Sequence, residues 1–226
     1  MMIYPSEEQA KRDIIEAGKR MYAGAYVAAN DGNISARVSE NEIWATPTNV
    51  SKGFMTEDML VKLDLDGNIL GGTLKPSSEV KMHLALYRED SEILGVVHAH
   101  PPIATAFAAA GIALDEALLQ ETVVMLGVVP VVPYTCPGTA ALAETVAPFC
   151  RDYNAALLEH HGAVTWAGSV MEAYYRLERV EYYAKLMMYS RMMNITRPLT
   201  ETQIDELMTL RTAWNVSKGG RPKGRE

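Results

Sequence analysis

The sequence predicts a single α/β domain in which a central, mixed sheet is flanked by helices. Short apolar runs bounded by turn residues, such as residues 94–97, 128–132 and 155–158, have the length of buried strands. They alternate along the chain with segments whose apolar residues recur at helical spacing, the longest covering residues 169–193. No composition break of domain size and no internal repeat interrupts this alternation, so the 226 residues fit one domain.

The first half of the chain is expected to begin with a helix and to continue with hairpins. Ser6 is a good helix cap, and Gly24 is a typical helix end. Turn residues at 30–33 and 66–68 separate the apolar runs that follow. The elements expected here are a helix over 7–23, a hairpin with strands over 34–38 and 42–45, a short helical turn from residue 56, a strand over 61–65, and a second helix opened by Pro76, Ser77, Ser78 and Glu79, with Ser77 or Ser78 as its cap.

The second half alternates strands and helices and ends in a basic tail. The elements expected here are a strand over 94–97, a helix over 103–110, a strand over 128–132, a helix over 138–150, strands over 155–158 and 163–166, a long helix over 169–193 and a last helix over 200–212. Residues 217–226 are rich in Gly, Pro, Lys and Arg, a composition with little apolar surface to bury. We therefore expect one folded domain over residues 1–216 and a mobile tail over residues 217–226.

Composition and charge argue against several classes of protein. The formal net charge of −7 disfavours a nucleic-acid surface. The longest apolar stretches are broken by Pro, Gly, His or charged residues, so no segment is expected to cross a membrane. Cys136 and Cys150 are too few for a disulfide framework, and the first residues lack the basic-then-apolar pattern of a signal peptide. These features predict a cytoplasmic protein without nucleic-acid or membrane partners.

The stretch 94–102 suggests chemistry more directly than any other. His98 and His100 follow the apolar strand at its carboxyl end. Residues two apart in an extended chain point to the same side, about 6–7 Å apart along the backbone, so the two imidazoles can share one metal ion. Pro101 and Pro102 then end the strand and suit the first turn of a helix. This is a typical place for a site in an α/β sheet, although two partly exposed strand-end histidines are the plainer interpretation.

A third imidazole can come from the segment Glu159-His160-His161-Gly162, which also follows an apolar strand. Catalytic zinc commonly takes three protein ligands and keeps one position open. Because adjacent residues of a strand point opposite ways, only one of the two histidines is expected to reach the metal, and we favour His161, next to Gly162. His160 would then be packed or would support a ligand. His83, on a helix, is interpreted as a satisfied core or interface histidine.

Glu79 is the carboxylate of interest. A glutamate at a helix start is favoured by the helix dipole, which is the plain interpretation. Glu79 is also expected to point at the same cleft as the histidines. Beside a dication it could act as a general base, and it could ligate the metal when substrate is absent.

Three polar loops suggest an anion site. Their small hydrogen-bond donors are Asn33, Thr48, Asn49, Ser77 and Ser78. Ser77 and Ser78 also open a helix, whose free N–H groups attract phosphate. Taken singly, each is an ordinary turn or cap residue, but together they would hold a monoester phosphate without a Walker loop. The nearest lysines, Lys52 and Lys75, are interpreted as surface or loop residues.

Five short stretches of the chain occur in the same order in a known family. They are Gly32-Asn33-Ile34-Ser35, Thr46-Pro47-Thr48-Asn49, Lys75-Pro76-Ser77-Ser78-Glu79, Val97-His98-Ala99-His100-Pro101 and His160-His161-Gly162. Through them the sequence resembles the class II aldolase/adducin family, and in particular aldolases of the L-fuculose-1-phosphate type. They span most of the chain and leave only its last quarter outside.

The resemblance implies a three-layer α/β/α fold and a fourfold-symmetric homotetramer whose active sites lie between subunits. It implies one Zn²⁺ per subunit on His98, His100 and His161, with Glu79 as the catalytic acid/base and as a metal ligand of the resting state. The phosphate-binding positions that it implies are Asn33, Thr48, Asn49, Ser77 and Ser78, with Asn49 where the family usually has glycine. The implied reaction cleaves a ketose 1-phosphate to dihydroxyacetone phosphate and an aldehyde through a metal-stabilised enediolate.

Departures from the family pattern keep further functions open. The aldolases commonly use a tyrosine in the segment after the first helix beyond the metal pair and another in the C-terminal tail. Here the first region reads Leu119-Gln120-Glu121-Thr122, and no tyrosine follows Tyr189, so Glu121 is the proton donor that we suggest instead. The epimerases of the family use an aspartate in that same segment, which is absent here and disfavours 4-epimerisation. A dehydratase, a decarboxylase of a phosphorylated oxo-acid and a non-catalytic adducin-like module stay open, although such a module is expected to have lost its metal ligands.

Overall fold

The computed structural model describes residues 2–194, 197–214 and 216–225. Its centre is an eight-stranded sheet in the order β4-β3-β2-β1-β5-β8-β7-β6. The strands are β1 (Asn33–Arg37), β2 (Glu42–Ala45), β3 (Val61–Asp64), β4 (Ile69–Gly71), β5 (Gly95–Ala99), β6 (Val131–Val132), β7 (Ala155–Leu158) and β8 (Gly162–Ala167). All neighbouring strands are antiparallel except β6 and β7, which run parallel. The predicted α/β class with a mixed, largely antiparallel sheet is confirmed.

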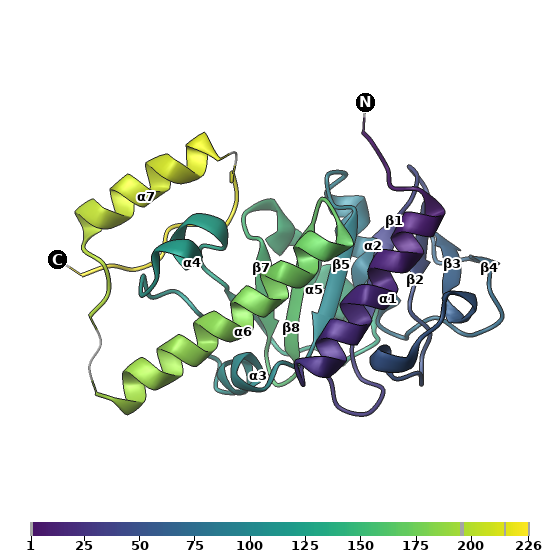
Figure 1. Cartoon of the computed structure of the whole chain (residues 1–226), viewed down its shortest axis with the longest axis horizontal. Helices are drawn as coiled ribbons and strands as arrows, with labels where there is room; N and C mark the ends of the chain where they lie inside the picture. The colour runs from purple at the N-terminus through teal and green to yellow at the C-terminus, as the bar shows by residue number, and fades with distance from the viewer. Residues whose placement is uncertain (1, 195–196, 215, 226) are drawn as a thin grey trace.

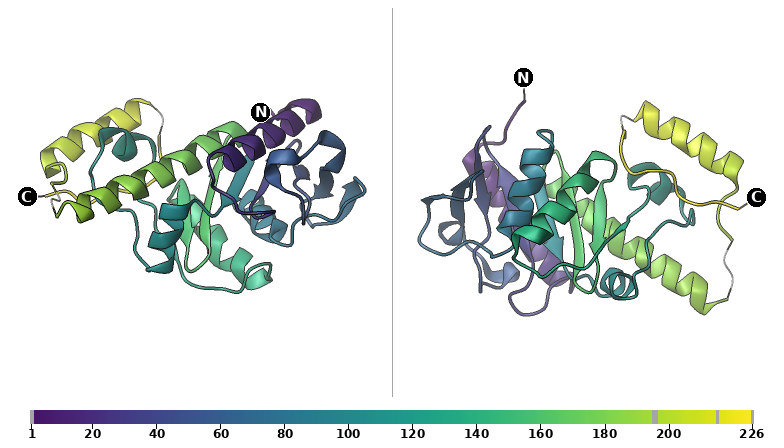
Figure 2. Two further views of the ribbon diagram at one scale, coloured as in Figure 1. Left: turned by 60° about the horizontal axis from the view of Figure 1, so that its bottom comes forward. Right: turned by 180° about the vertical axis from the view of Figure 1, so that it is seen from behind.

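Helices cover both faces of this sheet. On one face lie α1 (Glu7–Ala23), α3 (Pro102–Ala109) and α6 (Val170–Met192), and on the other lie α2 (Val80–Glu89) and α5 (Ala140–Val146) (Figure 1, Figure 2). The helices α4 (Gln120–Met125) and α7 (Glu201–Ala213) pack against each other at the end of the molecule where the chain finishes. The layers are therefore α/β/α, as expected. Among the helices described, none is both long and apolar enough to cross a membrane.

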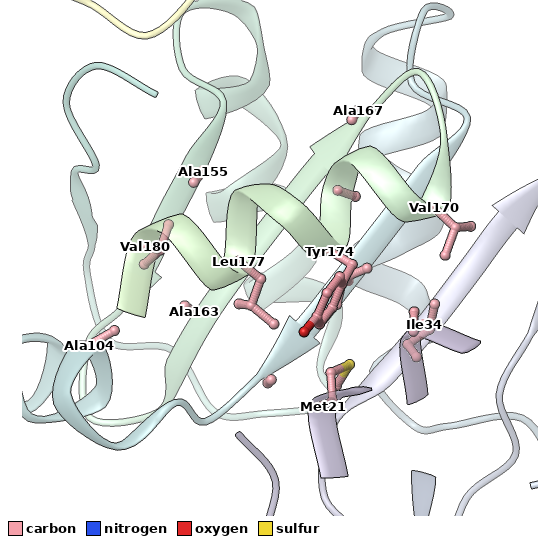
Figure 3. Packing of buried hydrophobic residues seen from close by; sticks show 14 of the residues in the cluster. Met21, Ile34, Ala104, Ala155, Ala163, Ala167, Val170, Tyr174, Leu177 and Val180 are labelled. Atoms are coloured by element: carbon pink, nitrogen blue, oxygen red, sulfur yellow. The ribbon is translucent and has the colours of Figure 1, made fainter. Parts of the chain in front are cut away.

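The alternation of side chains along β5 decides which residues can reach the site. Val97 and Ala99 belong to the apolar cluster beneath α6, where Tyr174 and Leu177 also pack (Figure 3). Val96 belongs to the cluster on the opposite face, beneath α2. His98 lies two residues after Val96, so its imidazole points to the α2 face.

Side-chain caps start most of the long helices, and the cap at Ser6 is the one that the sequence predicts. Ser6, Ser169 and Thr200 each accept a hydrogen bond from a backbone N–H in the first turn of α1, α6 and α7. α2 differs from the prediction, because its N-cap position is Glu79 and neither preceding serine caps it. Instead, Ser77 Oγ accepts the backbone N–H of Glu79 at 3.3 Å. The Glu79 carboxylate itself makes no capping hydrogen bond to the first turn of α2.

Other segments also depart from the predicted elements. The strand expected over 128–132 is confined to β6, because the N–H of Val128 donates to Gly219 O at 2.6 Å rather than to β7. The helix expected over 138–150 stops at Val146, and Pro148, which has no N–H to donate, lies in the 3-10 turn that follows. α4 and β4 are additional elements, with six and three residues, too short to show a period in the sequence.

The tail makes specific contacts where the sequence predicts a mobile segment. Asn154 Nδ2 donates to Lys218 O at 2.7 Å, and the Lys218 ammonium pairs with Asp90. Arg211 is buried and donates to Gly220 O at 2.9 Å. Most of these contacts use backbone groups, which composition does not reveal. The described part of the tail is therefore packed onto the domain, whereas its mobility stays a prediction.

The contact between β5 and the start of α6 leaves no room for a side chain at Gly95. A Cβ there would lie in hard contact with the backbone of Ser169 and Val170. Gly95→Ala should lower the free energy of unfolding by about 1–3 kcal/mol, because the backbone of one element must move. Chemical denaturation of this variant and of Gly168→Ala measures the effect. Gly168 is the control, since a Cβ there comes no closer than 3.8 Å to another atom. Equal stabilities would contradict this packing.

Candidate metal centre

Three imidazoles meet at the edge of the sheet where β5 ends and β8 begins. Ala99 of β5 pairs with Ala163 of β8, so His98 and His100 come close to His161, which directly precedes β8. One ring nitrogen from each histidine lies within 4.8 Å of the other two. The ring centroids of His98 and His161 are 4.6 Å apart. The structure therefore brings together the three histidines that the sequence singles out.

The two remaining candidate histidines lie elsewhere. His160 is exposed and has a left-handed φ of 56°, so it makes the turn between β7 and β8 rather than joining the cluster. It is therefore not packed, which was one of the two expectations for it. His83 is buried on α2, with its Nδ1 2.7 Å from Ser35 Oγ. Burial lowers the pKa of His83 to about 4, so its ring is neutral at pH 7. His83 is thus a core histidine, but it is not fully satisfied as expected, because its buried Nε2 has no hydrogen-bond partner among the described residues.

Hydrogen bonds on the outer side of the rings orient two of the imidazoles. His98 Nδ1 lies 2.9 Å from Ala163 O, an acceptor that keeps the proton on this nitrogen. His100 Nδ1 faces Asp31 Oδ2 at 3.4 Å. Burial lowers the pKa of His98 to about 3 and also lowers the pKa of His100. Both rings are neutral at pH 7, the form in which histidine binds metals.

The inner sides of the rings present lone pairs to one another. His98 Nε2 and His100 Nε2 are 3.2 Å apart. The Glu79 carboxylate faces the same point, with Oε2 3.4 Å from His98 Nε2 and Oε1 3.1 Å from His161 Nε2. Glu79 Oε1 is buried without a hydrogen-bond partner among the residues described. Several acceptors without donors between them fit a shared divalent cation, and imidazole nitrogen with carboxylate oxygen is a donor set that suits zinc.

Asn33 holds Glu79 in place rather than standing free in a loop. It lies on β1 directly opposite His98 in the strand register. Its Nδ2 donates to Glu79 Oε2 at 2.8 Å. Although burial disfavours the charged carboxylate, the facing His161 and this hydrogen bond from Asn33 hold the pKa of Glu79 below its ordinary value. Glu79 is therefore ionised at pH 7 and can accept a proton. A role of Asn33 at a phosphate stays a prediction.

The loops predicted to hold phosphate adjoin one another next to Glu79. Thr48 N donates to Lys75 O at 3.0 Å, and Ser77 N donates to Thr46 O at 3.2 Å. Asn49 has a left-handed φ of 59°. Asparagine tolerates this conformation better than other non-glycine residues, which explains how it replaces the usual glycine. Thr48, Asn49, Ser77 and Ser78 thus come from two neighbouring loops, while phosphate binding by them stays a prediction.

Glu121 and Lys52 lie in surroundings that differ from those expected from the sequence. Glu121 is exposed on α4, which packs against α7, and no described contact links it to the three histidines. Lys52 is not a surface residue, because only 1% of it is exposed and its Nζ donates to Asn30 O at 2.9 Å. Sequence reasoning also missed Asp31, which it treated as a turn residue. Its place directly before the Gly32-Asn33 motif was the available signal.

Three clustered imidazoles and a buried carboxylate lie at one edge of the sheet in an α/β/α domain. This arrangement is typical of a metal-dependent enzyme. Residues 12–188 match the family model for the Class II Aldolase and Adducin N-terminal domain. The chain therefore belongs to the class II aldolase and adducin family, as the sequence motifs suggested.

The similar proteins include enzymes with two different named activities. A 3-oxo-tetronate 4-phosphate decarboxylase of Pectobacterium atrosepticum is 34% identical over 186 residues, covering 80% of this chain and 85% of the relative. An L-fuculose phosphate aldolase of Methanocaldococcus jannaschii is 34% identical over 176 residues, covering 78% and 94%. Among solved structures, an L-fuculose 1-phosphate aldolase has a TM-score of 0.83 at 26% identity, covering 92% of this chain and 98% of its own. YgbL from Klebsiella pneumoniae, described as a putative aldolase/epimerase/decarboxylase, has a TM-score of 0.83 at 30% identity, covering 90% and 99%.

Adjacent histidines provide a matched pair for testing the centre. His161→Ala should lower divalent-metal affinity at least about 100-fold, because it removes one of three imidazole ligands. His160→Ala should retain the metal, since His160 lies outside the cluster. Metal content after dialysis, measured by mass spectrometry and by zinc titration, checks both variants. Equal metal retention by His161→Ala and the unaltered protein would exclude His161 as a ligand.

The Asp31 carboxylate should tune the centre through His100. Asp31→Asn weakens the acceptor that faces His100 Nδ1, so metal affinity is expected to fall about 10–100-fold. Competition with a chelator of known zinc affinity measures the change. Asp66→Asn is the control, because Asp66 is exposed in the turn between β3 and β4. If the two variants bind zinc equally well, the contact with His100 has no role in metal binding.

Proposed function

We propose that the protein is a zinc-dependent carbon–carbon lyase that cleaves a ketose 1-phosphate, similar to L-fuculose 1-phosphate, into dihydroxyacetone phosphate and an aldehyde. The observation that carries this proposal is the position of the Glu79 carboxylate, with Oε2 3.4 Å from His98 Nε2 and Oε1 3.1 Å from His161 Nε2. This arrangement combines a group that can move a proton with a site for a cation. Family membership and the aldolases among the relatives support it.

The reaction breaks the bond between C3 and C4 of the ketose. The C4 hydroxyl would pass its proton to a base, for which Glu121 is the candidate in this chain and from which the proton returns to solvent. C4 becomes the aldehyde carbon, and the electron pair of the bond stays on C3 as an enediolate. Bound zinc on His98, His100 and His161 would supply the positive charge that stabilises the enediolate oxygens. Glu79 would take up a proton from solvent water and deliver it to C3, and Asn33 would keep the carboxylate aimed at that carbon through its 2.8 Å hydrogen bond.

Decarboxylation of a phosphorylated 3-oxo acid is a second candidate. When the carboxylate of 3-oxo-tetronate 4-phosphate leaves as CO₂, the electron pair stays on the carbon beside the carbonyl and gives an enediolate of dihydroxyacetone phosphate. No hydroxyl proton has to be removed in this reaction. The specific observation that favours it is that the segment 119–122 and the chain after Tyr189 hold no tyrosine for that proton transfer. Relatives with this activity, 34% identical, add support.

The remaining expectations belong to the same proposal. Thr48, Asn49, Ser77 and Ser78 would bind the substrate phosphate on their two adjoining loops, and Asn33 would assist. The protein would work as a cytoplasmic homotetramer with one Zn²⁺ per subunit and with sites between subunits. Glu121, which is exposed on α4, would act as a proton donor only at a site to which a neighbouring subunit contributes. A non-catalytic module is disfavoured by the intact histidine cluster.

Substrate profiling separates the two candidate reactions. Zinc-loaded protein is expected to release dihydroxyacetone phosphate from L-fuculose 1-phosphate or from 3-oxo-tetronate 4-phosphate. Coupled oxidation of NADH by glycerol-3-phosphate dehydrogenase measures this common product. Trapping of lactaldehyde indicates the aldolase, and CO₂ release indicates the decarboxylase. A panel of ketose 1-phosphates that differ at C4 and C5 extends the search, and no dihydroxyacetone phosphate from any of them would exclude the proposed lyase.

Replacing the carboxylate tests its role in either reaction. Glu79→Gln should lower kcat by about 10²–10⁴-fold, because the amide cannot move a proton at the enediolate carbon. Zinc should remain bound, since the three histidines are unchanged. Turnover and zinc content are measured on the same preparation, with Glu92→Gln, an exposed glutamate, as the control. Unchanged turnover in Glu79→Gln would rule out Glu79 as the acid/base.

A further inference from the structure

Lys52 has a buried ammonium group, and the reaction proposed above assigns no role to it. It begins a short 3-10 turn, Lys52–Phe54, directly after the Thr48-Asn49 loop. Its Nζ donates to Asn30 O at 2.9 Å and to Val50 O at 2.5 Å. Two carbonyl groups from two different loops therefore take two of its three N–H donors.

The positive charge of Lys52 has no carboxylate partner in direct contact. Within the described residues, no carboxylate oxygen lies within 4.0 Å of this ammonium. Asp31 is the charged group whose field acts on it, and the Asp31 carboxylate faces His100. Burial lowers the pKa of Lys52 to about 8. Burying a charge without a close counter-charge costs free energy, so an anion bound near this ammonium would be stabilised by it.

The ammonium is hydrogen-bonded to residues that adjoin the loop predicted to hold phosphate. One of its acceptors, Val50 O, belongs to the residue after Asn49. The other belongs to Asn30, whose side chain donates to Asn49 Oδ1 at 3.4 Å. Lys75, in the neighbouring loop, is exposed, so water and salt screen its charge. Of these two lysines near the Thr48-Asn49 loop, Lys52 therefore has the less screened charge.

We propose that Lys52 supplies the positive charge that balances the phosphate dianion of the substrate, acting through the Thr48-Asn49 loop as a positioning residue. This inference rests on the proposed function, since it takes the substrate to be a phosphate monoester. Holding two carbonyl groups together needs only hydrogen-bond donors, and a neutral side chain could do that. The positive charge has an effect of its own only if an anion binds at this loop, where the charge would attract it.

Phosphate binding without turnover tests this assignment. Calorimetry of the full-length, metal-loaded protein measures the affinity for inorganic phosphate and for sulfate, which is a dianion at every pH used. Lys52→Gln keeps hydrogen-bond donors but removes the charge, and it should weaken both anions by about 10-fold or more. Lys52→Arg keeps the charge and should bind them within a few-fold of the unaltered protein. Lys75→Gln is the control for an exposed lysine and should have little effect.

The pH dependence of sulfate binding gives a second readout. It compares the unaltered protein with Lys52→Arg and so does not require a variant that lacks the positive charge. The free protein loses the Lys52 charge as the pH rises through about 8, so sulfate affinity should fall between about pH 7.5 and pH 9.5. In Lys52→Arg the affinity should stay level over this range, because guanidinium remains charged. This comparison decides between the two roles of Lys52 even if Lys52→Gln does not fold.

Three results would overturn the inference: no binding of either anion, equal binding by Lys52→Gln and the unaltered protein, or equal pH profiles for the unaltered protein and Lys52→Arg. A merely structural lysine would change stability in Lys52→Gln but would leave the pH profile of sulfate binding level. Failure of the proposed lyase activity is seen separately, because anion binding is measured without turnover.

Discussion

Lone pairs of three imidazoles and one carboxylate converge on a single point, and the rest of the site depends on this convergence. His98 Nε2 lies 3.2 Å from His100 Nε2 and 3.4 Å from Glu79 Oε2. Hydrogen-bond acceptors this close repel one another unless a cation or a proton lies between them. Cation binding and the local fold are therefore linked, since the ion would supply the attraction that these residues lack on their own.

A buried polar network keeps the carboxylate over this point. Ser35 Oγ on β1 lies 2.7 Å from His83 Nδ1 and 2.8 Å from Tyr87 Oη, both on α2. Burial raises the pKa of Tyr87, so its hydroxyl stays protonated. These contacts fix α2 relative to β1, and Glu79 at the start of α2 then meets His98 of the neighbouring strand β5. The same residues that form the core on the α2 face thus also set the geometry of the site.

The residues that could be predicted are those whose direction follows from local structure. His98 and His100 share a side because they are two residues apart at a strand end, and His161 could be chosen over His160 because adjacent residues diverge at a turn. Asp31 and Lys52 could not be found in this way. Their roles come from contacts between loops that are distant in the sequence, such as Lys52 Nζ with Asn30 O, and a turn signal or a lysine in a loop has no periodic pattern that predicts its partner.

The leaving group is harder to assign than the central chemistry for a related physical reason. Both candidate reactions place an electron pair on a carbon beside a carbonyl. The residues proposed to stabilise it lie at strand ends and at a helix start, which fix the directions of their side chains: His98, His100, His161 and Glu79. The step that differs between them, removal of a hydroxyl proton, would need a further group, for which the proposed candidate is Glu121 on the short helix α4. In the proposed function, specificity between an aldehyde and CO₂ would therefore depend on residues held by loops, by the tail and by a neighbouring subunit, whereas stabilisation of the enediolate would depend on residues at the edge of the sheet.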